Sequence, residues 1–342
     1  MNLLSRVRAL RKNEMLIGNV DEPFSNNIDT ISGNRIRRRI VLKTRGCSVP
    51  TCTMCPLPDE SVPVNTELSK WNLVNQIKMA LTSDDIEEDV LTIYTNGNFF
   101  AEKEITGEIR RELYCMIAKR KAREIVVESL PHFVNGNVLD EFADICPGKK
   151  LVIAIGLQSY SDEVREYAIN SKCRLEHFEL CIDLLRDRGF SAQVFLMFGS
   201  PFLNEKEMID DVLYSVNALQ KYGPVISNIV ISPLRVARNT VVQDLYEKGL
   251  YIPPSTASLL SLMDLLLTWN LSGNVRIATS ILTGIDKIDS IRLKSSSDLI
   301  EKIKLWNIGE GTWFEPILDV DFPDGNYPEL RNRVTEYLAQ FS

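Results

Sequence analysis

Three cysteines lie within nine residues of chain, at positions 47, 52 and 55, in the spacing C-x4-C-x2-C. Three thiolates can bind three irons of a [4Fe–4S] cube, which leaves the fourth iron open to an external chelating molecule. Half of a zinc site is the alternative, although a structural zinc takes four ligands. The other cysteines offer no clear fourth ligand, because Cys181 lies on an apolar helical stripe and Cys115 reads as core. The spacing therefore favours a cluster bound by Cys47, Cys52 and Cys55.

The composition is that of a globular protein with a sizeable core. The chain has 342 residues, of which 44% are hydrophobic and 25% are charged, as is usual for such proteins. It contains no apolar run of about eighteen residues, and the N-terminal segment has no apolar stretch typical of a secretory signal. Seven cysteines without paired spacing do not suggest a disulfide framework. We therefore expect a cytoplasmic protein with no membrane partner.

The formal charge of −7 is unevenly distributed. Residues 1–45 carry ten Lys and Arg against four Asp and Glu, so this segment has a charge of +6 and the remainder has −13. A nucleic-acid contact, if the chain makes one, would centre on this segment and its stretch Arg35 to Arg39. A solvated basic face, or salt bridges to the acidic remainder, is the favoured interpretation of that stretch.

Short β-branched runs alternate with longer segments of helical periodicity from residue 39 onward. The expected strands are 39–44, 89–94, 124–128, 151–157, 192–198 and 228–231, and the expected helices lie near 66–82, 105–121, 136–145, 161–188 and 204–221. This alternation predicts right-handed βαβ units and a parallel sheet. Six units suit a partial (β/α)6 TIM-like barrel, with a doubly wound open sheet as the alternative. In such barrels the chemistry lies at the carboxyl ends of the strands, where the cysteine loop follows the first strand.

The pattern differs at the two ends of the chain. Residues 1–34 predict a short helix over 1–12 and a connecting loop over 13–34, and residues 35–234 form the barrel. Residues 235–342 read as a C-terminal mixed α/β extension packed on the barrel. Its expected elements are an apolar helix capped by Ser255, a strand near 276–279, and helices near 296–305 and 328–340.

Several ordered segments carry a family resemblance. They are Lys43 to Ser48, Cys52 to Cys55, Val126 to Ser129, Ala154 to Ser159, Asp162 to Arg165, Ser200 to Leu203 and Tyr251 to Pro254. Over roughly residues 35–265 the chain resembles the radical S-adenosylmethionine (SAM) superfamily, and within it the lyase subunit of archaeosine synthase and its Elongator-catalytic-subunit-like relatives. The commonest spacing in that superfamily is C-x3-C-x2-C, so this chain differs in spacing while it keeps the number of ligands.

Two strand ends offer polar groups for SAM on physical grounds. The turn Thr95, Asn96 and Gly97 ends the second strand and exposes backbone carbonyls that can accept hydrogen bonds from the SAM amino group, unless it is an ordinary turn. Glu128 ends the third strand, where a carboxylate suits a ribose diol or a cationic amine. A salt bridge to a neighbouring loop is the alternative for Glu128.

The resemblance implies further SAM contacts. Similar enzymes use the position of Gln158, at the end of the fourth strand, to contact the ribose or the methionyl group. Arg165 could pair bidentately with the methionyl carboxylate, and a surface ion pair with a nearby acidic residue is its alternative. Met54 occupies a position where relatives often place an apolar side chain beside the adenine.

The resemblance also implies a reductive mechanism. A flavodoxin- or ferredoxin-like donor would reduce the cluster, and SAM would then cleave to methionine and a 5′-deoxyadenosyl radical that takes hydrogen from a C–H bond. We expect bond cleavage, rearrangement or functionalisation of a small-molecule or carrier-bound substrate, because the chain is acidic and has no cysteine after Cys181. A tRNA-modifying lyase of the archaeosine type, working with a partner subunit, is the alternative. A non-catalytic zinc- or cluster-binding partner protein is the second.

Overall fold

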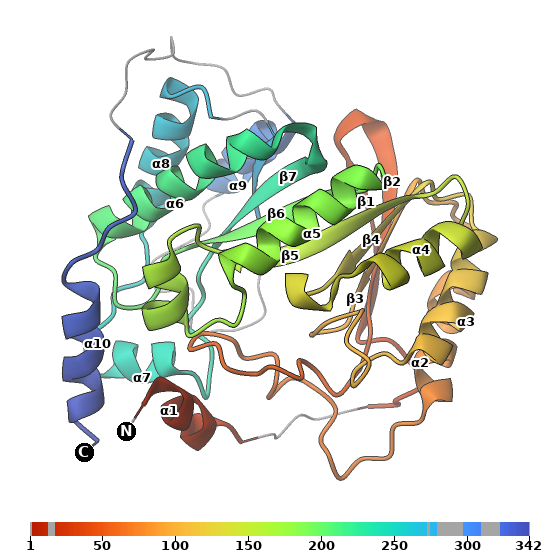
Figure 1. The fold of residues 1–342 in the computed structure, drawn as a ribbon, viewed down its shortest axis with the longest axis horizontal. Helices are drawn as coiled ribbons and strands as arrows, with labels where there is room; N and C mark the ends of the chain where they lie inside the picture. The colour runs from red at the N-terminus through yellow and green to blue at the C-terminus, as the bar shows by residue number, and fades with distance from the viewer. Residues whose placement is uncertain (1, 13–17, 272–273, 279–296, 309–321, 342) are drawn as a thin grey trace.

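The computed structural model describes residues 2–12, 18–271, 274–278, 297–308 and 322–341. Eight strands form one sheet in chain order, so that each strand pairs with its neighbours in sequence (Figure 1). Their bounds are β1 Ser25–Ile31, β2 Arg35–Val41, β3 Val90–Tyr94, β4 Glu124–Glu128, β5 Lys150–Gln158, β6 Ser191–Phe198, β7 Ile226–Pro233 and β8 Val275–Ile277. Strands β2 to β8 are parallel, and β1 is antiparallel to β2. The predicted partial barrel is confirmed.

The helices follow the strands in the alternation that the sequence predicts. They are α1 Leu3–Leu10, α2 Lys70–Thr82, α3 Gly107–Ala118, α4 Gly136–Ile145, α5 Leu175–Asp187, α6 Glu205–Leu219, α7 Val241–Glu247, α8 Thr256–Thr268, α9 Ser297–Ile308 and α10 Leu330–Ala339. Several begin at side-chain caps that the sequence indicates. Asn204 and Glu207 form a capping box at the start of α6, and Ser255 caps α8.

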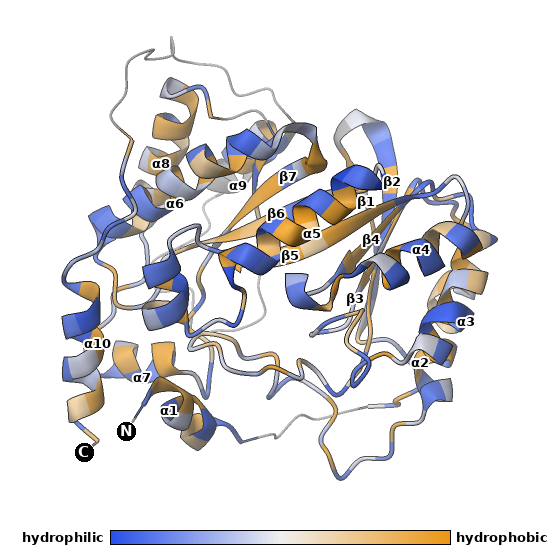
Figure 2. Ribbon diagram, viewed as in Figure 1, coloured by the Kyte–Doolittle hydropathy of each residue, from blue (hydrophilic) through white to orange (hydrophobic). Residues whose placement is uncertain are grey.

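The main core lies between one face of the sheet and the helices. Ile40, Ile93 and Ile153 are fully buried on this face and pack in one cluster with apolar side chains of the helices. Figure 1 shows α4, α5 and α6 along this face, and Figure 2 shows that β5 to β7 are mostly hydrophobic. The opposite face carries a smaller apolar cluster that includes Val126 and Val152. Alternate residues of each strand therefore pack in different apolar clusters on the two faces of the sheet.

Several sequence predictions are wrong in position or type. The loop expected over 13–34 contains β1, an edge strand without a clear apolar alternation, and the first parallel strand covers 35–41 rather than 39–44. The helix expected over 161–188 is broken into a π-helical segment, Val164–Ile169, and α5, because Asn170 adopts a left-handed conformation with φ of 55°. Helix α7 was not predicted. Cys115 is exposed rather than in the core, because it faces away from the buried side of α3.

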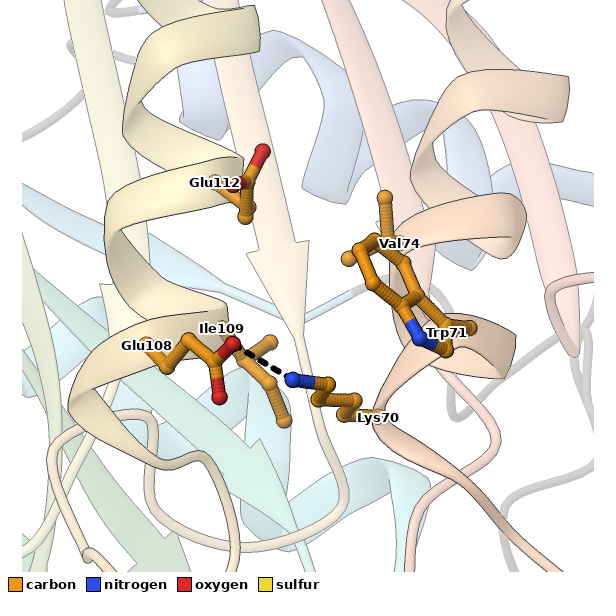
Figure 3. Close-up of a pocket in the computed structure, with 6 residues that line it drawn as sticks. All are labelled: Lys70, Trp71, Val74, Glu108, Ile109 and Glu112. Atoms are coloured by element: carbon orange, nitrogen blue, oxygen red, sulfur yellow. Dashed lines mark hydrogen bonds and ion pairs between the residues drawn. The ribbon is translucent and has the colours of Figure 1, made fainter.

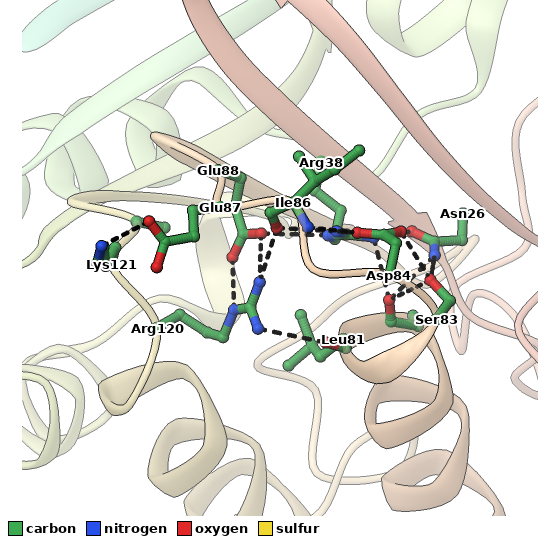
Figure 4. A network of polar contacts seen from close by, with 12 residues as sticks. Asn26, Arg38, Leu81, Ser83, Asp84, Ile86, Glu87, Glu88, Arg120 and Lys121 are labelled. Atoms are coloured by element: carbon green, nitrogen blue, oxygen red, sulfur yellow. Dashed lines mark hydrogen bonds and ion pairs between the residues drawn. The ribbon is translucent and has the colours of Figure 1, made fainter.

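The basic stretch on β2 is paired with acidic residues inside the fold. Arg38 is fully buried, where it forms ion pairs with Asp84 and Glu88, and Arg120 binds Glu88 from the other side (Figure 4). On the same strand, two further arginines pair with Asp29 and one pairs with Glu124. The expected salt bridges to the acidic remainder are therefore present for Arg35 and Arg38, whereas Arg37 and Arg39 pair with Asp29 within the basic segment itself.

The C-terminal region meets both the sheet and the N-terminal helix. Strand β8 extends the sheet beside β7, so the segment after residue 234 contributes to the same sheet. Helices α1 and α10, at the two ends of the chain, lie side by side in Figure 1. Arg6 on α1 and Tyr337 on α10 both contact Asp244 on α7, at 2.9 Å and 2.6 Å. The expected strand near 276–279 is present as β8, although Thr279 lies outside the described residues. None of the helices in the described ranges has the length and apolar character of a membrane span.

Candidate functional site

The cysteine loop is held by hydrogen bonds to segments far away in sequence. Thr53 donates its backbone N–H to the carbonyl of Ile169 at 2.9 Å, at the end of the π-helical segment. Thr51 and Asn170 exchange two hydrogen bonds, each of 2.8 Å, between side chain and backbone. The backbone N–H of Val241, at the start of α7, donates to the carbonyl of Thr53 at 2.9 Å. The break in the predicted helix therefore exposes the backbone groups to which the cysteine loop is hydrogen-bonded.

The three predicted ligands are partly buried, and Cys47 accepts hydrogen bonds at sulfur. The backbone N–H of Val49 and the side-chain amide of Asn98 donate to the Cys47 sulfur, at 3.3 Å and 3.5 Å. Burial raises the pKa of all three thiols, that of Cys55 to about 12. The neighbouring thiols of Cys55 and Cys47 raise the pKa of Cys52 further, and Cys47 raises that of Cys55. The free thiols therefore remain protonated at neutral pH and make poor nucleophiles.

This donor set fits an iron–sulfur cluster. Iron binds the thiolate directly and removes the cost that burial places on ionisation, and N–H donors to sulfur are a usual feature of such sites. Within the described ranges, no three Cys, His, Asp or Glu side chains are grouped to hold a single metal ion. A [4Fe–4S] cube does not require three ligands around one metal ion, because each of its cysteines binds a different iron. Cys173 lies near Cys52 but is buried in the apolar core.

An arginine that the sequence patterns did not single out also lies near the loop. Burial raises the pKa of the Cys52 and Cys55 thiols, and the positive charge of Arg11 opposes that rise at both. The Nη1 atom of Arg11 is buried and has no hydrogen-bond partner among the described residues. A buried guanidinium nitrogen without a partner is costly, and it indicates a place for an acceptor.

The turn after β3 packs directly against the first cysteine. A Cβ on Gly97 would lie 3.0 Å from the backbone nitrogen of Cys47, so only glycine permits this approach. Glu128 accepts hydrogen bonds through Oε1 from the backbone N–H groups of Thr95 and Gly97. Burial raises the pKa of Glu128 to about 7, against the opposing effect of those hydrogen bonds. Asn96, between them, has a left-handed φ of 58°.

Gln158 occupies an unusual backbone conformation at the end of β5. Its φ is +71°, and the pairing with β6 shifts register between Gly156 and Gln158. Its side chain folds back over Gly156, where a Cβ would lie 2.8 Å from the Gln158 Nε2 atom. A non-glycine residue held in this region is strained, and such residues cluster at functional sites.

Arg165 and Met54 have structural partners. The Arg165 guanidinium is 2% exposed, donates to the Ser159 carbonyl at 2.6 Å and forms a close ion pair with Asp162. Met54 is buried and belongs to the main apolar core. The structure thus brings Cys47, Cys52, Cys55, the turn at 95–97 and Glu128 to the carboxyl edge of the sheet, while Arg165 is already engaged. Direct contacts of these residues with SAM stay predictions.

Two residues that hold the first cysteine were missed by sequence reasoning. Glu104 and Asn98 lie between β3 and α3 and bond to the cysteine loop. Neither stands in a periodic pattern, so the only available signal was their place directly after the glycine turn. A small pocket between α2 and α3, lined by Trp71, Ile109 and the Lys70–Glu108 ion pair, contains none of the predicted site residues (Figure 3).

Curated relatives match about two thirds of the chain. An uncharacterized protein of Methanocaldococcus jannaschii is 26% identical over 66% of this chain and 62% of its own length. Archaeosine synthase subunit beta of Methanosarcina acetivorans is 25% identical, covering 66% and 65%, and that of Thermococcus kodakarensis is 28% identical, covering 63% and 67%. The chain therefore matches less than two thirds of the length of the first two relatives.

Solved structures show weaker overall likeness. Archaeal Elp3 of Methanocaldococcus infernus has a TM-score of 0.45 and 14% identity, covering 61% of this chain and 51% of that one. Methylornithine synthase has a TM-score of 0.46 and 10% identity, covering 84% and 80%. The assignment therefore rests on the family model described as the radical SAM superfamily, which matches residues 41–215, just over half of the chain. The chain belongs to the radical SAM superfamily, and the expectation of a radical SAM enzyme is confirmed at that level.

Proposed function

We propose that this chain binds a [4Fe–4S] cluster through Cys47, Cys52 and Cys55, binds SAM at the open iron, and cleaves SAM to a 5′-deoxyadenosyl radical. The radical takes hydrogen from a small-molecule or carrier-bound substrate. The observation that carries the proposal is the cysteine loop, fixed at the carboxyl edge of the sheet, with hydrogen-bond donors aimed at the Cys47 sulfur. When bound, the cluster supplies the electron for SAM cleavage, and a flavodoxin- or ferredoxin-like protein supplies the electron to the cluster.

The chain's own polar groups supply the remaining SAM contacts. Glu128 uses only Oε1 in the hydrogen bonds to the turn, so we assign Oε2 to the ribose diol or the amino group of SAM. The turn at 95–97 keeps its place beside Cys47, and its carbonyls can accept from the amino group. Gln158 offers a donor and an acceptor without charge.

We assign the methionyl carboxylate to Arg11 rather than Arg165. The Arg165 guanidinium already binds Ser159 and Asp162, whereas Nη1 of Arg11 lies buried without a partner in the described part of the chain. Replacing Arg11 with Met should weaken SAM binding about tenfold or more, the usual worth of a hydrogen bond to a charged group. The exposed Arg8→Met is the matched control, and equal SAM affinity of both variants would reject this assignment.

A second candidate function follows from the names of two relatives. Archaeosine synthase subunit beta in two archaea is similar to this chain, which favours a tRNA-modifying lyase that works with a partner subunit. The pairing of Arg35, Arg37, Arg38 and Arg39 with acidic residues removes one basic patch from consideration for RNA. We therefore keep the small-molecule or carrier-bound substrate as the first candidate.

Anaerobic reconstitution tests the proposal. The wild type should bind four irons per chain by the cluster formula, and with SAM and a reductant it should release 5′-deoxyadenosine detectable by mass spectrometry. Cys55→Ala should lose both iron and product, whereas Cys173→Ala should keep them. Full cluster and full SAM cleavage in Cys55→Ala would reject the ligand assignment. Salt-dependent binding of tRNA at sub-micromolar protein would move the substrate assignment to the second candidate.

A further inference from the structure

Glu104 is a buried carboxylate that, among the described residues, accepts hydrogen bonds from Ser48 in the cysteine loop and from Asn98 beside the glycine turn. It is 9% exposed and lies between β3 and α3. Its Oε1 atom accepts from the backbone N–H and the hydroxyl of Ser48, at 2.7 Å and 2.6 Å. The same oxygen accepts from the side-chain amide of Asn98 at 2.7 Å, and Oε2 accepts from the Asn98 backbone N–H.

Asn98 connects this carboxylate to the first cysteine. Its side-chain nitrogen donates both to Glu104 and, at 3.5 Å, to the Cys47 sulfur. Its side-chain oxygen accepts from the backbone N–H of Leu130, just after β4, at 2.8 Å. Three hydrogen bonds therefore hold the Asn98 amide in one orientation, in which its N–H group points to the Cys47 sulfur.

The carboxylate is balanced by neutral hydrogen-bond donors. In the described part of the chain, Glu104 forms no ion pair with Lys, Arg or His, in contrast to Glu102, two residues earlier, which pairs with Arg110. A Cβ on Gly97 would lie 2.0 Å from the Glu104 Oε2 atom, so the glycine turn and the carboxylate also occupy one tightly packed space. A negative charge thus lies two hydrogen bonds from the Cys47 sulfur without a cation beside it.

We propose that Glu104 is a positioning residue for the cluster, which orients Cys47 through Ser48 and Asn98 and lowers the cluster's reduction potential through its negative charge. This rests on the proposed function. Reduction adds an electron to the cluster, so a nearby anion disfavours the reduced state, while hydrogen bonds to sulfur favour it. Glu104 and Asn98 therefore act on the potential with opposite signs.

The test compares a near-isosteric change at Glu104 with removal of the Asn98 amide in the anaerobically reconstituted full chain. Glu104→Gln should retain iron and shift the cluster's midpoint potential in the positive direction, because it removes the charge and keeps the shape. Asn98→Ala should shift the potential in the negative direction, because it removes the N–H contact to sulfur. Glu102→Gln is the matched control in the same loop and should change neither iron content nor potential. Redox titration followed by electron paramagnetic resonance measures all three.

The outcomes separate this proposal from the proposed function. A wild-type chain that takes up no iron would reject the proposed function itself. A wild type with a normal cluster, and Glu104→Gln at the wild-type potential, would reject only the role of Glu104. If Glu104→Gln takes up no iron while Glu104→Asp does, the charge is needed for cluster assembly, which supports the positioning role of Glu104. If neither takes up iron and both apoproteins are unfolded by circular dichroism, Glu104 serves the fold alone and the proposal fails.

Discussion

A buried carboxylate on α6 makes the stability of this protein depend on pH in a defined direction. Asp211 is 1% exposed, and its Oδ1 accepts hydrogen bonds from the hydroxyls of Ser159, at 2.6 Å, and Tyr327, at 3.4 Å. Burial raises the pKa of Asp211 from its ordinary 3.8 to about 7, although both hydrogen bonds oppose the rise. In the folded state the carboxyl therefore stays protonated at pH values where the unfolded chain has already ionised it.

The sign and size of the effect follow from this difference. The raised pKa gives a stabilising contribution that is fully present below the unfolded pKa and is lost as the pH rises through about 7. A separation of about three pKa units, at about 1.4 kcal/mol each, is worth roughly 4 kcal/mol. The wild type should therefore lose up to about 4 kcal/mol of unfolding free energy between pH 4 and pH 7 through this group. Asp211→Asn stays neutral at every pH and should not show this loss.

Urea denaturation followed by circular dichroism, at several pH values from about 4 to about 7.5, provides the measurement over the range between the unfolded and folded pKa values of the carboxyl. Asp210→Asn is the matched control, because Asp210 is the adjacent residue on α6 and forms its ion pair with Lys206 near the surface. Its pH profile should run parallel to that of the wild type. A parallel profile for Asp211→Asn as well would refute the reasoning, since it would mean that Asp211 ionises alike in the folded and unfolded states.

Three further substitutions test the buried ion pairs of the fold and the candidate cluster site. Arg38→Met should lower the free energy of unfolding by about 3–5 kcal/mol in urea, because it leaves the 1% exposed Glu88 with one cation instead of two; a loss under about 1 kcal/mol would contradict a buried pair. Gly97→Ala should reduce iron per chain after reconstitution, because its Cβ would lie 3.0 Å from the Cys47 nitrogen; full loading would show that the turn can move. Cys173→Ala should keep the wild-type iron content, and a drop to the level of a ligand variant would make Cys173 part of the cluster site.

Most helices and strands of the fold could be predicted from local sequence patterns. The alternation of β-branched runs with helical segments predicted six parallel strands, because each pattern reports burial on one face of one element. The capping box at Asn204 and the cap at Ser255 were also readable, since a cap is formed within four residues of chain. The edge strand β1 was not, because its pairing with β2 satisfies the backbone without an apolar pattern.

The candidate site also has a part that the sequence predicts and a part that only the structure shows. The sequence by itself determined the three thiols and their spacing, which is enough to predict a metal or cluster site. Only the tertiary structure decided what holds and surrounds them. These groups are the break at Asn170 against which the loop packs, the glycine turn against Cys47, the buried Glu104 carboxylate, and the Arg11 nitrogen, which is buried without a partner among the described residues. These groups come from segments up to about 120 residues apart, as between Thr51 and Asn170, and a pattern of neighbouring residues does not encode a pairing that the folded sheet creates.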